Sequence, residues 1–196
     1  GSQNNEIVID ANGLEGTPQR AKGLKPLYGN GCLDNTGAGV SVNESGGILT
    51  ICGASKGSED ASYVFNLPKG VSLSIDYNSP FANEDIEIKE MEGEVEVSTL
   101  NGDVKCINVT GPLVLNSISG DIEVTISKLN QNSPTSISLI SGDLDITLPL
   151  NSPANLEMSA LTGGVYTDFE IKTESKEGNL PRVGGSNINT KLNGGG

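Results

Sequence analysis

Aspartate side chains that follow glycine are the residues of this chain best suited to bind a ligand. Asp103, Asp121 and Asp143 each come directly after a glycine, and Asn or Ser precedes that glycine. If the segments that carry them stack, the carboxylates form a column whose oxygen atoms suit a hard cation such as Ca²⁺. Asp beside glycine is also an ordinary turn residue, because its side chain accepts hydrogen bonds from backbone N–H groups. We favour turn chemistry, and we assign no metal ligand and no cofactor-binding residue.

The composition removes most catalytic devices. The 196 residues include no histidine, the commonest general base and a common metal ligand. Neither a Ser–His nor a Cys–His nucleophile can be built, so we assign no catalytic residue. The aspartates also do not match calcium-binding nonapeptide repeats, which need a second glycine two residues before the Gly-x-Asp unit. A net charge of −13, from 12 basic and 25 acidic residues, disfavours nucleic acid and anionic membranes as partners.

The three cysteines divide into two kinds. Cys106 falls at an apolar position of the repeat described below, in the same column as Val124 and Ile146, so we expect a buried free thiol. Cys32 and Cys52 lie twenty residues apart in a less regular region. They could pair in an oxidising compartment, but the sequence alone leaves that pairing open.

A five-residue motif repeats along the chain and must position these side chains. It reads Leu or Ile, then Asn, Ser or Thr, then Gly, then Asp or Gly, then a fifth residue that is usually aliphatic. Five copies occur: 100–104, 118–122, 140–144, 161–165 and 192–196. Gly93, Gly102, Gly111 and Gly120 are spaced nine residues apart, and alternate ones lie in the motif, so one repeat has two strands and two turns in eighteen residues. Recurring turns between short strands predict a β-solenoid.

Apolar residues two apart predict which strand positions face the interior. One strand of the repeat supplies Val95, Val97 and Leu100 with their later equivalents. The other supplies an inward column of Val104, Ile122, Leu144 and Val165. Later coils have 21 to 22 residues, and the extra length falls at 128–133 and 149–153, which we expect to loop out.

We therefore predict an all-β single-domain solenoid, similar to a parallel β-helix, with about 18 to 22 residues per coil and essentially no helix. Residues 1–59 are expected to form irregular N-terminal strands and a cap, with short strands at 7–9, 40–42 and 48–51 and no readable structure over 13–35. Residues 60–196 are expected to hold the repeats in one continuous domain, most regular from about residue 60 to 190. No apolar run is long enough to span a membrane as a helix.

The run from Leu67-Pro68 through Gly93-Glu94-Val95, the three Gly-Asp turns and Leu148-Pro149 resembles an adhesin-like family of bacterial repeat-built secreted proteins, frequent in Bacteroidetes and of unknown function. The resemblance covers roughly residues 60 to 196. It implies a β-helix-like fold and an extracytoplasmic location at the cell surface, in the periplasm or secreted, with N-terminal lipid anchoring as one option. It carries over no catalytic residue.

The expected function is a non-enzymatic binding or structural module, adhesin-like, with a glycan or a cell-surface protein as the candidate partner. The alternative is a carbohydrate-active β-helix enzyme, a polysaccharide lyase or hydrolase, which the absence of His and Trp disfavours. We expect any ligand to meet the polar strand face or the loop 172–187. Tyr77 and Phe81 flank a turn and are candidates for exposed aromatic contacts, although core or edge packing is favoured. The sequence leaves the oligomeric state open.

Overall fold

The computed structural model describes residues 7–14, 18–24, 31–54, 58, 61–78, 84–171 and 185–196. In these residues the only helix is a three-residue 3₁₀ turn, Gln19–Ala21. None of the described helices could cross a membrane. The described strands are β1 (Val8–Asn12), β2 (Val40–Ser45), β3 (Ile48–Gly53), β4 (Ser62–Asn66), β5 (Leu73–Tyr77), β6 (Ile86–Lys89), β7 (Val95–Thr99), β8 (Val104–Val109), β9 (Leu113–Ser119), β10 (Ile122–Ile126), β11 (Ser136–Ser141), β12 (Leu144–Thr147), β13 (Ala154–Ala160) and β14 (Ser186–Leu192). The predicted all-β class is confirmed.

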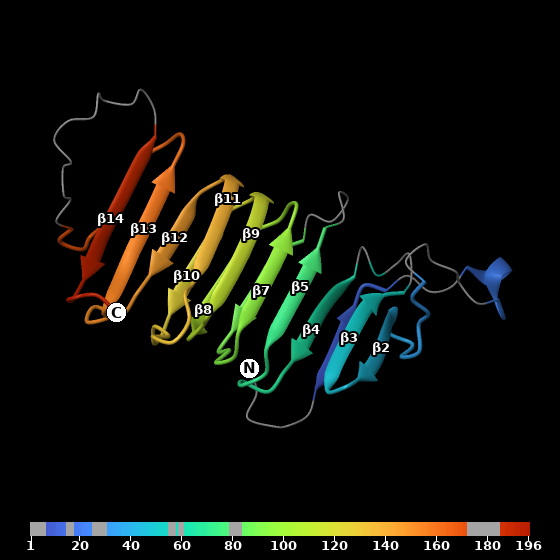
Figure 1. Cartoon of the computed structure of the whole chain (residues 1–196). Coiled ribbons are helices and arrows are strands. Elements are labelled where there is room, and N and C mark those ends of the chain that lie inside the picture. Colours follow the sequence, from blue (N-terminus) through green and yellow to red (C-terminus); the bar gives the residue numbers. More distant parts are fainter. Residues whose placement is uncertain are drawn as a thin grey trace.

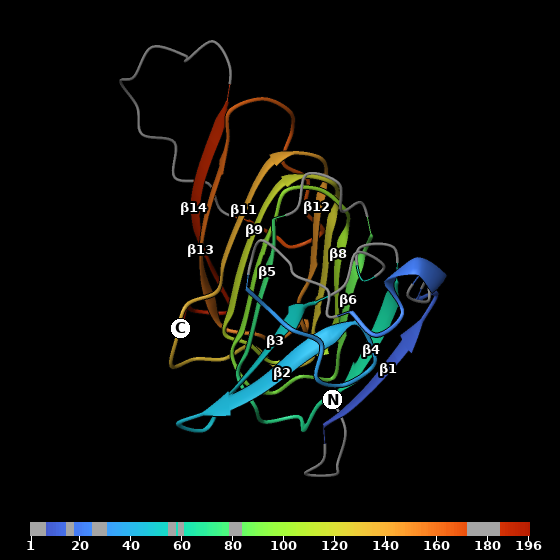
Figure 2. The ribbon, with the colours of Figure 1, turned by 90° about the vertical axis from the view of Figure 1, so that its right-hand side faces the viewer.

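Two parallel sheets form the body of the molecule. Strands β5, β7, β9 and β11 make one sheet, and β6, β8, β10 and β12 make the other. The chain alternates between them, so each coil contributes one strand to each sheet and the solenoid has about four coils. Figure 1 shows the strands side by side along the molecule, and Figure 2 shows the two sheets facing each other across the interior.

The core lies between the two sheets, where the inward residues of successive coils stack in register. Val104 pairs with Ile122 and Ile122 with Leu144, as the repeat predicts. Val95, Val97, Leu113 and Leu115 of the other sheet are fully buried. In this structure the column does not extend to Val165, its predicted fourth member: Val165 lies in no strand, and β12 pairs only with β10 among the described residues. Gly163-Gly164 replaces the Gly-Asp of the earlier turns, which gives this turn more backbone freedom.

The inward set of the first sheet also differs from the prediction. Strict alternation from Val95 and Val97 places Thr99 inward, and Leu100 falls out of phase. Thr99 and Ser117 are buried at equivalent positions, and their hydroxyls donate to the carbonyls of Asn101 (2.6 Å) and Ser119 (3.1 Å). A polar side chain can therefore occupy the core edge because its hydrogen bond is satisfied locally.

The solenoid is shorter than predicted, because the strands at both ends pair antiparallel. β13 pairs with β14 at one end, while β1 pairs with β4 and β2 with β3 at the other. The regular parallel stack therefore covers 73–147 rather than about 60–190. Ser186 and Asn187, expected in the loop 172–187, belong to β14, and residues 172–184 lie outside the described residues. The proposed domain boundary at residue 59 stays a prediction.

Glycine is required at the stacked turns of the repeat. Gly120 and Gly142 have φ of 112° and 132°. A Cβ atom would lie 2.4 Å from the carbonyl oxygen of Gly102 at Gly120, and 2.1 Å from that of Gly120 at Gly142. The coils therefore approach each other closely at this corner, and only the absence of a side chain allows it.

Candidate binding surface

The aspartates of the Gly-Asp turns form a ladder of hydrogen bonds between coils. The backbone N–H of Asp121 donates to Oδ1 of Asp103 (2.8 Å), and that of Asp143 donates to Oδ1 of Asp121 (2.8 Å). The ladder begins one coil earlier than the sequence indicated, because the N–H of Asp103 donates to Oδ1 of Asp85 (3.1 Å). Asp85 does not follow a glycine, so the motif could not reveal it; an acid eighteen residues before Asp103 was the available signal.

In this geometry the aspartate side chains accept hydrogen bonds from backbone N–H groups, as we predicted when we favoured a turn role over cation binding. The donors, however, belong to the following coil. Asp85, Asp103 and Asp121 each accept a hydrogen bond from the backbone of the following coil. In the described part of the chain, no group of three or more acidic, cysteine or histidine side chains is placed to hold a metal ion. The ladder therefore has a structural role between coils.

The outer face of the β6–β8–β10–β12 sheet carries charges that largely pair with one another. Glu87, Lys105, Glu123 and Asp145 form one row across the four strands. Lys105 Nζ lies 2.5 Å from Glu123 Oε2, and this hydrogen bond raises the pKa of Lys105. Lys89 likewise contacts Glu87 at 2.7 Å. Exposed ion pairs of this kind contribute little stability, but they leave few free charges on this face.

The outer face of the β5–β7–β9–β11 sheet combines a polar row with an apolar one. The polar row crosses all four strands in register: Asp76, Ser98, Asn116 and Ser138. Asn78 donates to Asp76 and, at 3.5 Å, to Ser98 Oγ. In the described residues the side chains of Asn116 and Ser138 have no such partner, so their hydrogen-bonding groups face solvent.

The apolar row lies two residues further along the strands, at the first position of the repeated motif. Leu100 is half-buried, whereas Ile118 and Ile140 are 47% and 76% exposed. We predicted core positions for these three residues, so an exposed apolar row on this face was not expected from the sequence. The signal for it was the spacing: Leu100 lies three positions after Val97, and an odd spacing places two side chains on opposite faces of a strand.

Two surface depressions flank the sheets. One, of about 230 Å³, lies at the corner opposite the aspartate ladder and is lined by Lys69, Glu90, Glu92, Asn108, Thr110 and Ser127. Lys69 and Glu90 form an ion pair of 3.0 Å there, and the hydrogen bond and charge of Lys69 lower the pKa of Glu90. These groups neutralise each other, and nothing else in this depression suggests chemistry.

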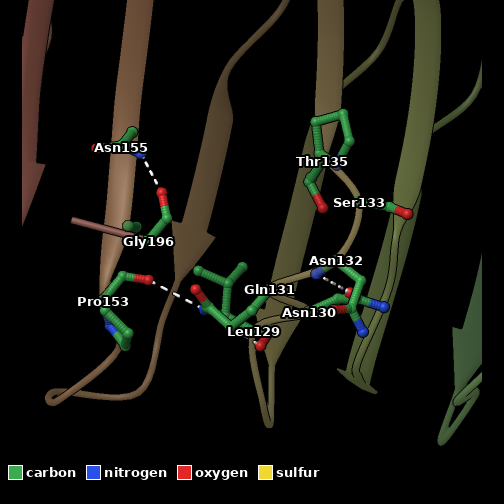
Figure 3. A pocket seen from close by; sticks show the side chains of 11 residues that line it. Leu129, Asn130, Gln131, Asn132, Ser133, Thr135, Pro153, Asn155 and Gly196 are labelled. Atoms are coloured by element: carbon green, nitrogen blue, oxygen red, sulfur yellow. Dashed lines mark hydrogen bonds between the residues drawn. The ribbon is translucent and has the colours of Figure 1, made fainter.

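The other depression, of about 310 Å³, is formed by the two segments that we expected to loop out (Figure 3). Gln131 Nε2 donates to the carbonyl of Pro153 (3.1 Å), and Asn155 donates to Gly196. The N–H of Asn132 donates to Asn130 Oδ1 (2.8 Å). The amide side chains thus join loops and the chain end, which indicates a structural role for this depression.

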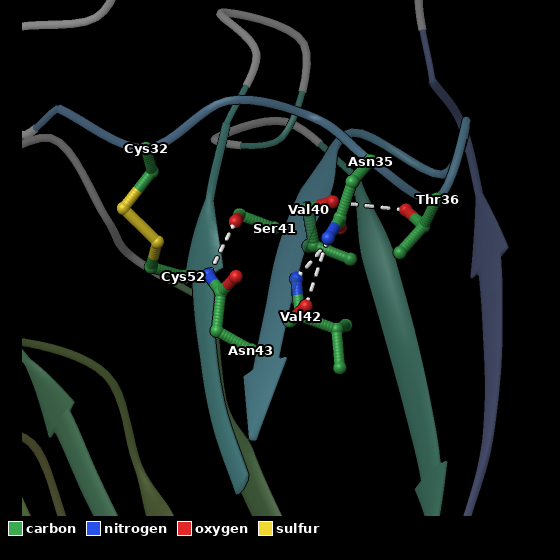
Figure 4. Close-up of a disulfide and its surroundings, with 8 residues drawn as sticks. All are labelled: Cys32, Asn35, Thr36, Val40, Ser41, Val42, Asn43 and Cys52. Atoms are coloured by element: carbon green, nitrogen blue, oxygen red, sulfur yellow. Dashed lines mark hydrogen bonds between the residues drawn. A yellow bond between two sulfur atoms is a disulfide. The ribbon is translucent and has the colours of Figure 1, made fainter. Parts of the chain in front are cut away.

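The cysteines follow the predictions where these were definite. Cys106 is fully buried between Ile88 and Val124, and burial raises the pKa of its thiol to about 12. Cys32 and Cys52 form a disulfide, with Cα atoms 6.5 Å apart (Figure 4). The bridge joins the segment before β2 to strand β3, so it anchors residues 31–35, the described end of the region whose structure the pattern left unread.

Hydrogen bonds of the Asn35 and Asp34 side chains also order residues 34–42. Both polar atoms of the Asn35 amide pair with the backbone of Val42 (Figure 4). Burial would raise the pKa of Asp34, but hydrogen bonds from the backbone N–H groups of Thr36, Gly37 and Gly39 lower it overall. These contacts give the loop a defined structure.

Of the two aromatic candidates, the structure describes one. Tyr77 is half-buried at the end of β5, and Phe81 lies outside the described residues. Tyr63 and Phe65 stack on β4 with ring centroids 6.0 Å apart, and the Tyr63 hydroxyl donates to the carbonyl of Ala38 (3.0 Å). The polar and apolar rows of the β5–β7–β9–β11 sheet are therefore the best candidate surface.

Comparison with known proteins identifies the family but no close relative. No curated protein and no solved structure matches the chain. The model of the family described as Toastrack DUF4097 matches residues 69–191, which is more than half of the chain and includes all four coils and the β13–β14 pair. The chain therefore belongs to the Toastrack DUF4097 family, a group of repeat-built β-solenoid domains.

Proposed function

We propose that the protein is a non-enzymatic binding module of the cell exterior, and that its ligand is an extended glycan. The observation that carries the proposal is the outer face of the β5–β7–β9–β11 sheet. There, hydroxyl, amide and carboxylate side chains form a row beside an apolar stripe of half-buried Leu100 and exposed Ile118 and Ile140.

The arrangement suits a sugar polymer for two reasons. A pyranose presents hydroxyl groups at its edge and C–H groups on its faces, so it can use polar and apolar rows at once. Neighbouring strands place equivalent side chains about 4.8 Å apart, which is comparable with the length of one sugar residue in an extended chain. A rigid parallel stack holds these groups in place before binding, which reduces the entropic cost of association.

The proposed location outside the cytoplasm has separate support. The Cys32–Cys52 disulfide is of the kind that persists in oxidising compartments and is rare in the cytosol. The adhesin-like resemblance points the same way, and attachment to a cell-surface protein is the second partner class that it implies.

A glycan-array screen of the full chain, combined with turnover assays on uronate polymers, tests the proposal. Binding to one class of extended glycan without release of products supports it. Release of unsaturated or reducing sugar products would replace it with the enzyme alternative. Binding to no glycan, together with saturable binding to a surface protein, would overturn the choice of ligand.

A further inference from the structure

The β6–β8–β10–β12 sheet ends at β12, and the last inward residues of this sheet are left uncovered. Leu144 and Ile146 continue the columns of Ile122 and Val124, which are each 1% exposed, yet they are 44% and 41% exposed themselves. Among the described residues, no strand pairs with the outer edge of β12. The apolar end of the stack and a backbone edge are therefore open together.

The backbone pattern shows which groups are left unpaired. The N–H of Val104 donates to the carbonyl of Asp121, and that of Ile122 donates to the carbonyl of Asp143. By the same pattern the N–H of Leu144 points toward the next coil, where the described residues offer it no acceptor. Likewise, Asp143 is the one member of the aspartate ladder whose carboxylate receives no N–H from a following coil in the described residues.

The sequence that follows β13 has the features of the missing strand. It begins with the last residue of the fourth copy of the motif, and Val165, Thr167, Phe169 and Ile171 alternate with Tyr166, Asp168 and Glu170. In the structure this segment forms no strand, and Tyr166 is 93% exposed. Strands β13 and β14 lie beyond β11 (Figure 1), so the segment begins at the end of the molecule where β12 is open.

We propose that residues 165–171 are a strap that docks on β12 as a further parallel strand and closes a fifth coil. Aligning Gly163 with Gly142 places Val165 beside Leu144, Tyr166 beside Asp145 and Thr167 beside Ile146. Val165 then covers the exposed end of one core column, and Thr167 covers the end of the other.

The same register explains why Gly164 replaces aspartate in the fourth copy. In the docked state its N–H takes the place that the N–H groups of Asp121 and Asp143 hold in earlier coils, and it donates to Asp143. A carboxylate at residue 164 would serve only a following coil, and the next copy of the motif, at 192–196, also has glycine at this position.

A second copy of the chain is the competing occupant of the edge. In an antiparallel pair of β12 strands, Asp145 of one copy would lie near Asp145 of the other. Two chains of net charge −13 would also repel each other. Charge therefore favours the strap, whose Tyr166 places a neutral side chain beside Asp145.

Cysteine cross-linking in the full chain tests the register of the strap. We expect the variant Asp145→Cys/Tyr166→Cys to form an intramolecular disulfide on mild oxidation, since paired residues of adjacent strands lie within bridging distance. Asp145→Cys/Glu170→Cys is the matched control, because its second cysteine is displaced four residues along the strand, about 13 Å. Equal cross-linking of both pairs would overturn the proposal, as would a disulfide-linked dimer of Asp145→Cys alone.

Amide hydrogen exchange of the unmodified chain is a second test of docking, and it needs no variant. A docked strap protects the amides of Leu144 and Ile146 to a degree comparable with Ile122 and Val124. Exchange of the two β12 amides at the rate of an open strand edge would contradict docking. Neither result depends on whether the protein binds a glycan.

Discussion

The aspartate ladder should contribute to stability through its hydrogen bonds and oppose it through its charges, and substitutions at Asp121 separate the two effects. Asp121 accepts the backbone N–H of Asp143 and stands between two other carboxylates of the column. One hydrogen bond contributes about 1 kcal/mol net. Exposed carboxylates about 4.8 Å apart repel each other by roughly 1 kcal/mol per neighbouring pair before salt screening.

Asp121→Asn keeps an oxygen acceptor and removes the charge, whereas Asp121→Ala removes both. We expect Asp121→Ala to be about 1 kcal/mol less stable than Asp121→Asn at every salt concentration. Asp121→Asn should be at least as stable as the natural chain in dilute buffer. That advantage should shrink at 1 M salt, where the screening length falls to about 3 Å.

Urea unfolding followed by far-UV circular dichroism measures these differences, with unchanged m values as the check on comparable unfolding. Asp145 provides the control, because it is an exposed acid of the next coil with no hydrogen-bonded side-chain partner in the described residues. Its Asn and Ala variants should agree within a few tenths of a kcal/mol. Equal stabilities of the two Asp121 variants would show that the ladder bonds seen in the structure do not stabilise the fold.

Three further predictions concern single residues. Gly142→Ala should lower the free energy of unfolding by more than about 2 kcal/mol, because its Cβ would meet a backbone carbonyl at 2.1 Å. Gly46→Ala is the control: Gly46 has a φ of 62° in open space, so this variant should lose only about 1 kcal/mol. Equal losses in urea unfolding would contradict the close approach of the coils. The Cys106 thiol should resist thiol reagents in the native protein and react on unfolding, since it is buried with its pKa raised to about 12; rapid native labelling would contradict its burial. The pKa of Asp34 is lowered in the folded protein, so its contribution to stability is present above its ordinary pKa of 3.8 and is lost as the pH falls through the folded-state pKa. Asp34→Asn should therefore flatten the acid limb of a plot of unfolding free energy against pH. An unchanged acid limb would refute this prediction.

The central coils were predictable because each strand keeps the same offset from its glycine turn. Val104, Ile122 and Leu144 recur with one spacing relative to the glycine turns, and each turn needs glycine for close approach of the coils. The same pattern could not predict how the ends pair. Alternating residues suit parallel and antiparallel strands equally, so the pairing of β13 with β14 left no local signal.

The candidate surface was predicted only in outline. The polar strand face was expected, but its apolar stripe was assigned to the core, because hydrophobicity outweighed the odd spacing between Val97 and Leu100. Thr99 and Ser117 took the inward positions because each hydroxyl finds a carbonyl two residues away. The Cys32–Cys52 bridge could not be predicted, since pairing depends on a geometry that spacing does not give.

Calorimetric titration of paired variants with the strongest glycan from an array screen tests the central claim most directly. Asn116 lies in the polar row of the β5–β7–β9–β11 sheet, and Thr125 occupies an outward position on the opposite sheet. Loss of one hydrogen bond should weaken binding by Asn116→Ala about twofold to tenfold, and Thr125→Ala should bind like the natural chain. Equal affinities of the two variants, or a larger loss in Thr125→Ala, would contradict the assignment of the binding surface.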